Sequence, residues 1–380
     1  MGTFGARHKD EAELARMKIK HGVKSLDELI EDDDSPVRWF RTNILKTNTE
    51  SLLREFSHLK RVDSFEEIKA PGVIYHDEFI PNLFGIHPKE KLTSTDAYKQ
   101  GRLIIQDRAS CFPAQILNPV PGKDKVIDAC AAPGNKTTHL ASLLNNSKRS
   151  IVAFEKDNKR IKTIRMMCEK AGGLDCITIH HADFTTTRPG DFPEITGMLV
   201  DPSCSGSGIF GRAFDEQEEI DEEEAKEKLA ERLLKLSSFQ YKIVKHALSF
   251  SNVLQVVYST CSIHVEENEG VVRKLLEDPD VQQQGWKVSS RADVLPTWPR
   301  RGHPEAFEGL TNKEELAEGC VRTLPKVDGG IGFFAVSFKR DFAEQSENTK
   351  SKGEELVDDD DGEVDDVDDD DGEEWTGIEN

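Results

Sequence analysis

The sequence predicts an α/β fold with a mostly parallel sheet, an antiparallel hairpin at its C-terminal edge and a small α+β segment in front. Short apolar runs alternate with helical patterns from about residue 101 onward. This alternation is typical of parallel strands that are covered on both faces. A Gly-Gly turn joins two apolar runs within 320–340, which indicates an antiparallel hairpin. Together these observations predict a Rossmann-like domain.

Local patterns place the elements of this sheet. Apolar runs that end in polar or glycine-rich turns predict strands at 125–130, 150–157, 176–184, 197–204 and 252–262. Apolar residues at helical spacing predict helices at 136–146, 158–173 and about 229–250.

Changes in composition divide the chain into segments. We expect a helical segment at 1–36, a small α+β segment at 37–100, a main domain at 101–340 with an acidic insert at 215–232, and a disordered acidic tail at 341–380. The net charge is −21, of which the tail carries −17. The remaining 340 residues carry only −4, so the charge does not exclude a nucleic-acid partner.

Cysteine usage and apolar content bound the environment of the protein. The chain has seven cysteines and no Cys-x-x-Cys pair, which argues for a reducing compartment and against a disulfide framework or a zinc site. We therefore expect no metal. The sequence holds no apolar run of the length, about 18 residues, that crosses a bilayer. We accordingly expect no membrane association.

The turn after the first predicted strand is rich in small residues. It reads "DACAAPGNKT" at 128–137, and its small side chains would let a ligand approach the backbone. Helix N–H groups after Gly134 would face that ligand. The turn matches neither the Gly-x-Gly-x-x-Gly dinucleotide loop nor the phosphate-binding loop. A plain strand-to-helix turn is the alternative interpretation.

Acidic residues end the next two strands. Glu155 is placed where nucleotide folds bind ribose hydroxyls, and Arg160 on the following helix could orient it. Asp183 could accept a hydrogen bond from an adenine amine. A surface salt bridge and a helix cap are the alternatives. The combination predicts an adenosine-containing cofactor without a diphosphate, which is S-adenosylmethionine.

Cysteines follow the last two parallel strands, in "DPSCSG" and "YSTCS". If these strands are neighbours, Cys204 and Cys261 lie at the same edge of the sheet. Each alone fits a buried packing residue equally well. Two thiols that face a methyl donor instead fit methylation of cytosine carbon 5, because a thiolate that adds to carbon 6 activates carbon 5. Asp201 could then bind the N3 and amino edge and discriminate cytosine from uracil.

The motifs of this chain resemble, in order, those of the Nol/Nop/Sun (NSUN) family of RNA cytosine-C5 methyltransferases. They are "QDRASC", "DACAAPGNKT", "FEKDNKR", "DPSCSGSG", "YSTCSIHVEENEGVV" and "DGGIGFFAVSF". The resemblance covers about residues 37–340. It implies a class I methyltransferase fold that uses S-adenosylmethionine.

The resemblance also implies roles for individual residues. Those that correspond to the cofactor pocket are Cys130, Ala131, Ala132, Pro133, Gly134, Asn135, Lys136, Glu155, Arg160, Asp183 and Asp201. The nucleophile corresponds to Cys261 of the Thr-Cys-Ser motif. Cys204 corresponds to the residue that helps to release the methylated product. For Asp201 we expect recognition of the base, from the argument on its carboxylate above.

Details of three motifs resemble one branch of the family. "PGNKT", "QDRASC" and "DPSCSGSG" are similar to the NSUN member five group, which methylates large-subunit ribosomal RNA. This implies ribosomal RNA as partner, a nuclear and nucleolar location, and pre-ribosomal proteins as candidate partners of a monomer. "RTNILKT" at 41–47 resembles an RNA-contacting segment, so we expect 37–100 to bind RNA. The basic stretches at 15–24, 38–46 and 159–165 offer further RNA contacts or are solvated faces.

Two alternatives stay open at this point. The catalytic motifs fit a transfer-RNA cytosine-C5 methyltransferase as well as a ribosomal one. A non-catalytic assembly factor could keep the fold and bind RNA without turnover. The intact cysteine pair and Asp201 argue against that second alternative.

Overall fold

The structure is a computed structural model that describes residues 35–209 and 222–340. The expected N-terminal helix, except for its last two positions, and the expected acidic tail lie outside the described residues. The same holds for the first part of the acidic insert. Those expectations stay predictions.

The first sheet has five strands in the order β2-β3-β4-β1-β5. Its strands are β1 (Arg38–Thr42), β2 (Lys60–Val62), β3 (Val73–His76), β4 (Leu83–Ile86) and β5 (Leu103–Ile105). The β2–β3 pair is parallel and the other pairs are antiparallel. Two helices of this region are α3 (Thr49–Glu55) and α4 (Asp96–Lys99). The predicted small α+β segment in front of the main sheet is thus confirmed.

The second sheet has eight strands and carries the predicted parallel core. Along its path the order is β11-β13-β10-β9-β6-β7-β8, and β12 pairs with β13. The parallel strands are β6 (Val126–Asp128), β7 (Ile151–Glu155), β8 (Ile177–His181), β9 (Gly197–Val200) and β10 (Gln255–Thr260). They lie where the sequence predicts strands, but each is shorter, because the polar residues at the strand ends turn out of the ladder.

Antiparallel strands complete one side of this sheet. They are β11 (Lys287–Val288), β12 (Cys320–Thr323) and β13 (Phe333–Lys339). The predicted hairpin is confirmed, since β12 and β13 pair antiparallel. β13 is not itself an edge, because it also pairs with β10 and β11.

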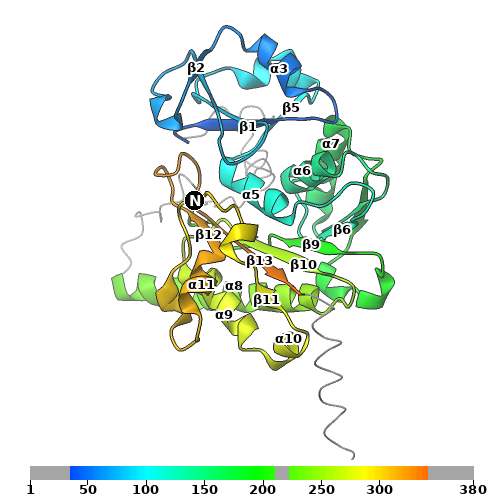
Figure 1. Ribbon diagram of the computed structural model, residues 1–380, viewed down its shortest axis with the longest axis vertical. Helices are drawn as coiled ribbons and strands as arrows, with labels where there is room; N and C mark the ends of the chain where they lie inside the picture. The colour runs from blue at the N-terminus through cyan, green and yellow to red at the C-terminus, as the bar shows by residue number, and fades with distance from the viewer. Residues whose placement is uncertain (1–34, 210–221, 341–380) are drawn as a thin grey trace, which may run out of the picture. The chain divides into compact units, whose positions relative to one another are not determined.

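Helices cover both faces of the second sheet. They are α5 (Arg108–Leu117), α6 (Asn135–Leu143), α7 (Asn158–Ala171), α8 (Glu222–Leu248), α9 (Glu269–Leu276), α10 (Pro279–Gln283) and α11 (Lys313–Glu318). Neighbouring residues of β10 point to opposite faces. Val257 packs in the cluster beside α5 and α6, and Val256 packs in the cluster beside α8 and α9. Figure 1 shows these helix pairs on opposite sides of β10 and β13.

Part of the predicted acidic insert belongs to a helix. The sequence places the long helix at about 229–250, whereas α8 already begins at Glu222. Ion pairs one turn apart, such as Lys228 with Glu224 at 2.7 Å, stabilise this first part of the helix. The described part of the insert, 222–232, is therefore the start of α8. None of the described helices is both long and apolar enough to cross a membrane.

The strand β1 does not present the RNA-contacting side chains that its sequence suggested. Residues 38–41 are buried, with exposed fractions of 3% or less. Arg41 reaches the main domain, where it donates to Thr138 Oγ1 (2.8 Å) and to the carbonyl of Asn135 (3.3 Å), and it also donates to Gln106 Oε1 (2.7 Å). A buried guanidinium needs such partners. The interpretation that these arginines contact phosphate is therefore wrong.

Candidate active site

The carboxyl ends of the parallel strands gather the predicted site residues at one edge of the sheet. Asp128 ends β6 and Glu155 ends β7. Asp201 comes directly after β9, and Cys261 directly after β10. Because β6, β7, β9 and β10 run parallel, their ends meet at the edge where open α/β sheets bind ligands.

The small-residue turn connects β6 to α6. Gly134 has a φ of +114°, a backbone conformation that residues other than glycine rarely adopt. A Cβ there would lie 3.2 Å from that of Met167 on α7, so the turn also packs tightly against a helix. The two ends of the turn are joined, since Thr137 Oγ1 on α6 donates to Asp128 Oδ2 at the end of β6 at 2.7 Å. Burial raises the pKa of Asp128 to about 6.

Arg160 holds the Glu155 carboxylate against this turn. Its Nη1 lies 3.3 Å from Glu155 Oε2, and its Nη2 donates to the carbonyl of Ala132 at 2.6 Å. Glu155 Oε1 accepts from the backbone N–H of Asp157 at 2.8 Å. A carboxylate oxygen has two lone pairs, so Glu155 keeps acceptor capacity for ligand hydroxyls.

Asp183 follows the end of β8 by two residues and acts as a cap. Its Oδ1 accepts from the Thr185 N–H (2.9 Å) and hydroxyl (2.7 Å), which is the capping role that the sequence left as an alternative. Burial raises the pKa of Asp183, but hydrogen bonds from Thr185 and Lys156 outweigh it and hold the pKa below the usual value. The side chain stays 34% exposed, so it can still meet a ligand.

The two cysteines at the ends of β9 and β10 are neighbours. Cys204 Sγ and Cys261 Sγ lie 2.9 Å apart. Cys204 is buried and Cys261 is partly exposed. Cys130 also follows a strand end, but burial raises its pKa far above the ordinary value, so it stays a thiol. Cys261 is thus the member of the pair that a substrate can reach.

Lys136 lies beside Asp201, which the sequence did not predict. Its Nζ lies 2.8 Å from Asp201 Oδ2 and donates to Ser110 Oγ at 3.1 Å. Burial lowers the pKa of Lys136, but its attraction to Asp201 and Cys261 outweighs this and leaves the pKa raised. Ser259 Oγ donates to Asp201 Oδ1 at 2.6 Å. The Lys136 ammonium therefore pairs with the Asp201 carboxylate, and its charge also interacts with Cys261.

The residues of this edge fit S-adenosylmethionine. The carboxylates of Glu155 and Asp183 supply acceptors for hydroxyl and amine groups, and they would repel a diphosphate. The small turn of Ala131 and Ala132, both buried, leaves its backbone close to the strand ends. The described residues hold no group of three or more His, Cys, Asp or Glu side chains that could bind a metal ion.

Known proteins give this arrangement a family. A profile described as "16S rRNA methyltransferase RsmB/F" matches residues 114–339. The chain belongs to the RsmB/F family. The family that the sequence motifs indicated is thereby confirmed, because NSUN proteins are members of it.

Named relatives of this RsmB/F chain act on ribosomal RNA. The "25S rRNA (cytosine-C(5))-methyltransferase rcm1" of Schizosaccharomyces pombe is 41% identical over 89% of this chain and 72% of its own length. The "28S rRNA (cytosine-C(5))-methyltransferase" of Mus musculus is 37% identical over 90% of this chain and 71% of its own length. Both matches extend across the two sheets.

Solved structures show the same fold. A methyltransferase homologue from Pyrococcus horikoshii superimposes with a TM-score of 0.61 at 24% identity, covering 83% of this chain and 90% of its own. NSun6 from the same organism gives a TM-score of 0.55 at 18% identity, covering 85% and 97%. The predicted class I methyltransferase fold of this RsmB/F chain is confirmed.

Proposed function

We propose that this RsmB/F chain methylates carbon 5 of a cytosine in large-subunit ribosomal RNA, with Cys261 as its nucleophile. The enzyme class, an S-adenosylmethionine-dependent rRNA cytosine-C5 methyltransferase, is that of the relatives. The observation that carries the assignment of roles is the pair of sulfurs 2.9 Å apart beside Asp201 and Lys136. This arrangement supplies a nucleophile, a second thiol and a base-recognition group at one strand edge.

The chemistry begins with the thiolate of Cys261. It forms a bond to carbon 6 of the cytosine, and the ring electrons then make carbon 5 nucleophilic. Bound S-adenosylmethionine would supply the methyl group that carbon 5 takes up, and the bond from that methyl group to the sulfonium would break, so that S-adenosylhomocysteine leaves. A base then takes the carbon-5 proton, and the electrons of that C–H bond re-form the double bond between carbons 5 and 6. The bond from Cys261 to carbon 6 breaks, and its electrons leave with the sulfur, which restores the thiolate.

The other side chains act on this sequence through charge and contact. The Lys136 ammonium interacts with Cys261 and so stabilises the thiolate before attack and after release. Asp201, held by Lys136 and Ser259, presents its carboxylate to the amino edge of the base. Cys204 touches the leaving sulfur, which supports a role in release of the product.

The substrate proposal rests on the relatives. Their printed names specify 25S and 28S rRNA, and we extend this to large-subunit rRNA for this chain. A nucleolar location, pre-ribosomal proteins as partners and a monomeric state complete the proposal. For the small sheet, exposed Lys60 and Arg61 on β2 support RNA binding better than the buried arginines of β1.

Covalent capture tests the proposed function. RNA that contains 5-azacytidine traps such an enzyme through its nucleophile, so wild type should form a complex that survives denaturing electrophoresis. Cys261→Ala should abolish both the complex and methylation. Cys204→Ala should form the complex with ordinary cytosine RNA and release it slowly. If Cys261→Ala still methylates and Cys204→Ala does not, the roles are reversed.

Mapping of the product tests the substrate. Bisulfite sequencing of large-subunit ribosomal RNA and transfer RNA, incubated separately with wild type and Cys261→Ala, should show 5-methylcytosine only in the ribosomal RNA treated with wild type. Methylation of the transfer RNA alone would overturn the substrate proposal and leave the chemistry standing.

A further inference from the structure

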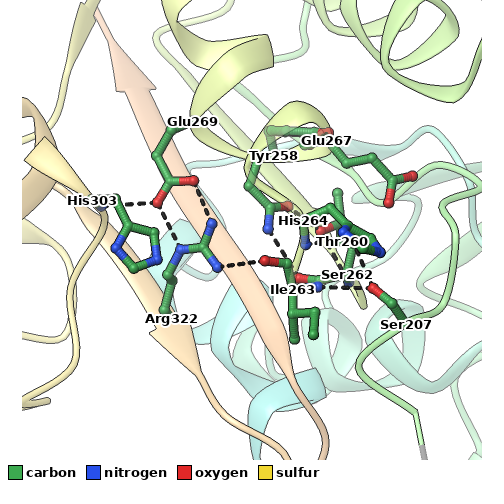
Figure 2. A network of polar contacts seen from close by, with 11 residues as sticks. Ser207, Tyr258, Thr260, Ser262, Ile263, His264, Glu267, Glu269, His303 and Arg322 are labelled. Atoms are coloured by element: carbon green, nitrogen blue, oxygen red, sulfur yellow. Dashed lines mark hydrogen bonds and ion pairs between the residues drawn. The ribbon is translucent and has the colours of Figure 1, made fainter. Parts of the chain in front are cut away.

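A buried polar network surrounds the loop that carries Cys261. The loop runs from the end of β10 through the short helix η5 (Val265–Glu267) to α9. Figure 2 shows Arg322 bonded to Glu269 at one end of this network and Ser207 beside Ser262 of the loop at the other. Within this loop, Glu267 and Asn268 are adjacent, and both are 0% exposed. Neither has a part in the chemistry described above.

Glu267 holds the segment that contains Cys204. Its Oε1 accepts from the backbone N–H of Ser205 at 2.8 Å and from Gln240 Nε2 at 2.9 Å. The same Gln240 amide donates to the carbonyl of Ser203 at 3.0 Å. Ser203 and Ser205 are the two chain neighbours of Cys204. The backbone on both sides of that cysteine is therefore fixed by Glu267 and its partner on α8.

Asn268 holds the segment that contains Cys261 in the same manner. Its Oδ1 accepts from the Thr260 hydroxyl at 2.5 Å, and its Nδ2 donates to the carbonyl of Ser262 at 3.0 Å. Thr260 and Ser262 are the two chain neighbours of Cys261. The side chain of Asn268 thus spans the nucleophile position.

The main chain of Glu267 fixes Glu267 and Asn268 to the sheet. Its carbonyl accepts from the Tyr258 hydroxyl at 2.5 Å, and Tyr258 is a fully buried residue of β10. Consecutive side chains on an anchored backbone cannot move far apart, so the two cysteine segments that they hold keep a fixed separation. Side chains locked by packing and hydrogen bonds are what hold reacting groups in place.

We propose that Glu267 and Asn268 are positioning residues that form a clamp, with one residue holding each cysteine segment and the pair setting the distance between the two sulfurs. The clamp acts on the reaction only through Cys204 and Cys261, and it rests on the roles proposed for them above. The clamp keeps Cys204 beside the sulfur of Cys261, so that Cys204 is in place when that sulfur leaves the base.

Burial of the Glu267 carboxylate costs folding free energy, and we attribute its presence to the position that it gives Cys204. The carboxylate is fully buried and carries its two hydrogen bonds on Oε1, while Oε2 has no hydrogen-bond partner in the part of the chain that the structure describes. Burial of a charged group with an unsatisfied oxygen opposes folding. A charged acceptor makes a stronger bond to the Ser205 N–H than a neutral one does, and that strength benefits the geometry of Cys204.

The first experiment measures the sulfur pair without RNA or cofactor. The full chain is equilibrated in glutathione buffers of stepped potential, and the Cys204–Cys261 disulfide is quantified by mass spectrometry of its peptides. Oxidised glutathione accepts the two electrons and the two thiol protons, so that one disulfide forms in the protein and two molecules of reduced glutathione leave. The equilibrium reports the effective concentration of one thiol at the other. We expect it to fall about tenfold in Glu267→Ala and in Asn268→Ala.

The second experiment measures turnover. Misplacement of reacting groups by about 1 Å costs on the order of 100-fold in rate, so we expect kcat of both alanine variants to fall by about that factor with KM for RNA and S-adenosylmethionine unchanged. Glu267→Gln keeps an acceptor for Ser205 and should restore most of the rate. Glu266→Ala removes an exposed neighbouring carboxylate and is the matched control with wild-type values.

The variants keep the proposal open to disproof even where an alanine variant fails to fold. Asn268→Asp still accepts from Thr260 but has no donor for Ser262, so it should show the same losses at smaller size. Wild-type thiol equilibrium and kcat in Asn268→Asp and Glu267→Ala would overturn the clamp. If wild type methylates no RNA, the proposed function fails, yet the thiol equilibrium still decides whether the clamp exists.

Discussion

The carboxyl edge of the eight-stranded sheet has two halves that are built differently. In the half made by β6, β7 and β8, which we call the cofactor half after its proposed role, Glu155 and Asp183 are each held by a residue close to them in the sequence. Glu155 bonds to the N–H two residues on, and Asp183 bonds to Thr185, also two residues on. In the half made by β9 and β10, which we call the catalytic half after its proposed role, the partners are distant. Cys204 and Cys261 are 57 residues apart, and Ser205 and Glu267 are 62 apart.

The difference teaches which part of the site depends on the fold. A turn that supplies its own hydrogen bonds keeps its geometry whenever its short segment is in place. A pair of loops joined by side chains keeps its geometry only when the sheet and helices around it are intact. We therefore expect disturbances of packing to damage the thiol pair before they damage the cofactor half.

The largest effect should come from the ion pair beside the Cys261 loop. Glu269 and Arg322 are 0% and 3% exposed and lie 2.5 Å apart, and Arg322 also donates to the carbonyl of Ile263. Glu269→Ala leaves a buried guanidinium without its charge partner, which should cost about 3–5 kcal/mol in the free energy of unfolding. Urea unfolding followed by fluorescence and circular dichroism measures it.

A double substitution serves as the control for this ion pair. Replacing both Glu269 and Arg322 by leucine removes the unpaired charge, so the double variant should recover much of the stability lost in Glu269→Ala. A loss below 1 kcal/mol in the single variant would contradict the view that the catalytic half depends on this buried pair.

A second effect concerns the pH dependence of stability and arises in the cofactor half, at Asp128. Because the pKa of Asp128 is about 6 in the folded chain and 3.8 ordinarily, the folded state holds a proton that the unfolded state releases. This contribution to stability is therefore complete below about pH 4 and is lost as the pH rises to about 6. At about 1.4 kcal/mol for each pKa unit, Asp128→Asn should gain about 3 kcal/mol on wild type across that range. Urea unfolding at several pH values measures this, and a difference that does not change with pH would contradict it.

A third effect should be confined to the cofactor half. Glu155→Gln replaces a charged acceptor by a neutral one and weakens the contact with Arg160, which should reduce binding of S-adenosylmethionine by about 1.5–3 kcal/mol. Titration calorimetry measures it. The Cys204–Cys261 equilibrium should stay at the wild-type value, and a parallel change in both would show that the halves are not independent.

The smallest effect concerns the cap at Asp183. Asp183→Ala removes the acceptor of the Thr185 N–H and should cost about 1 kcal/mol of stability, measured by thermal unfolding. Asp183→Asn keeps an acceptor and should cost less. An equal loss in both variants would assign the effect to charge rather than to the cap.

What the sequence predicts follows the same division. The parallel sheet, its hairpin and the strand-end position of Glu155 come from patterns within single segments, and the structure has them there. Asp183 instead lies two residues after the end of β8. The neighbourhood of Cys204 and Cys261 follows from the adjacency of their strands, which the alternating pattern suggests. Such inferences need no knowledge of how one loop contacts another.

The remainder of the site could not be predicted because it depends on contacts across the fold. The sequence assigned Lys136 to the cofactor turn, but the length of its side chain lets it reach Asp201. It gave Glu267 and Asn268 no role, since nothing in "EENE" tells which acids turn inward. Arg41 follows two aromatic residues, a pattern that suggests an RNA contact. Only the structure shows that α6 accepts its hydrogen bonds instead.

Arg41 also limits how this enzyme can be altered. A side chain from the first strand of the small sheet satisfies the Thr138 hydroxyl and the Asn135 carbonyl in the first turn of α6. Exchange of the small sheet for another domain would remove these bonds from the helix that follows the small-residue turn. Attempts to redirect the enzyme to new targets should therefore retain residues 38–42 and graft new sequence elsewhere, for instance around β2.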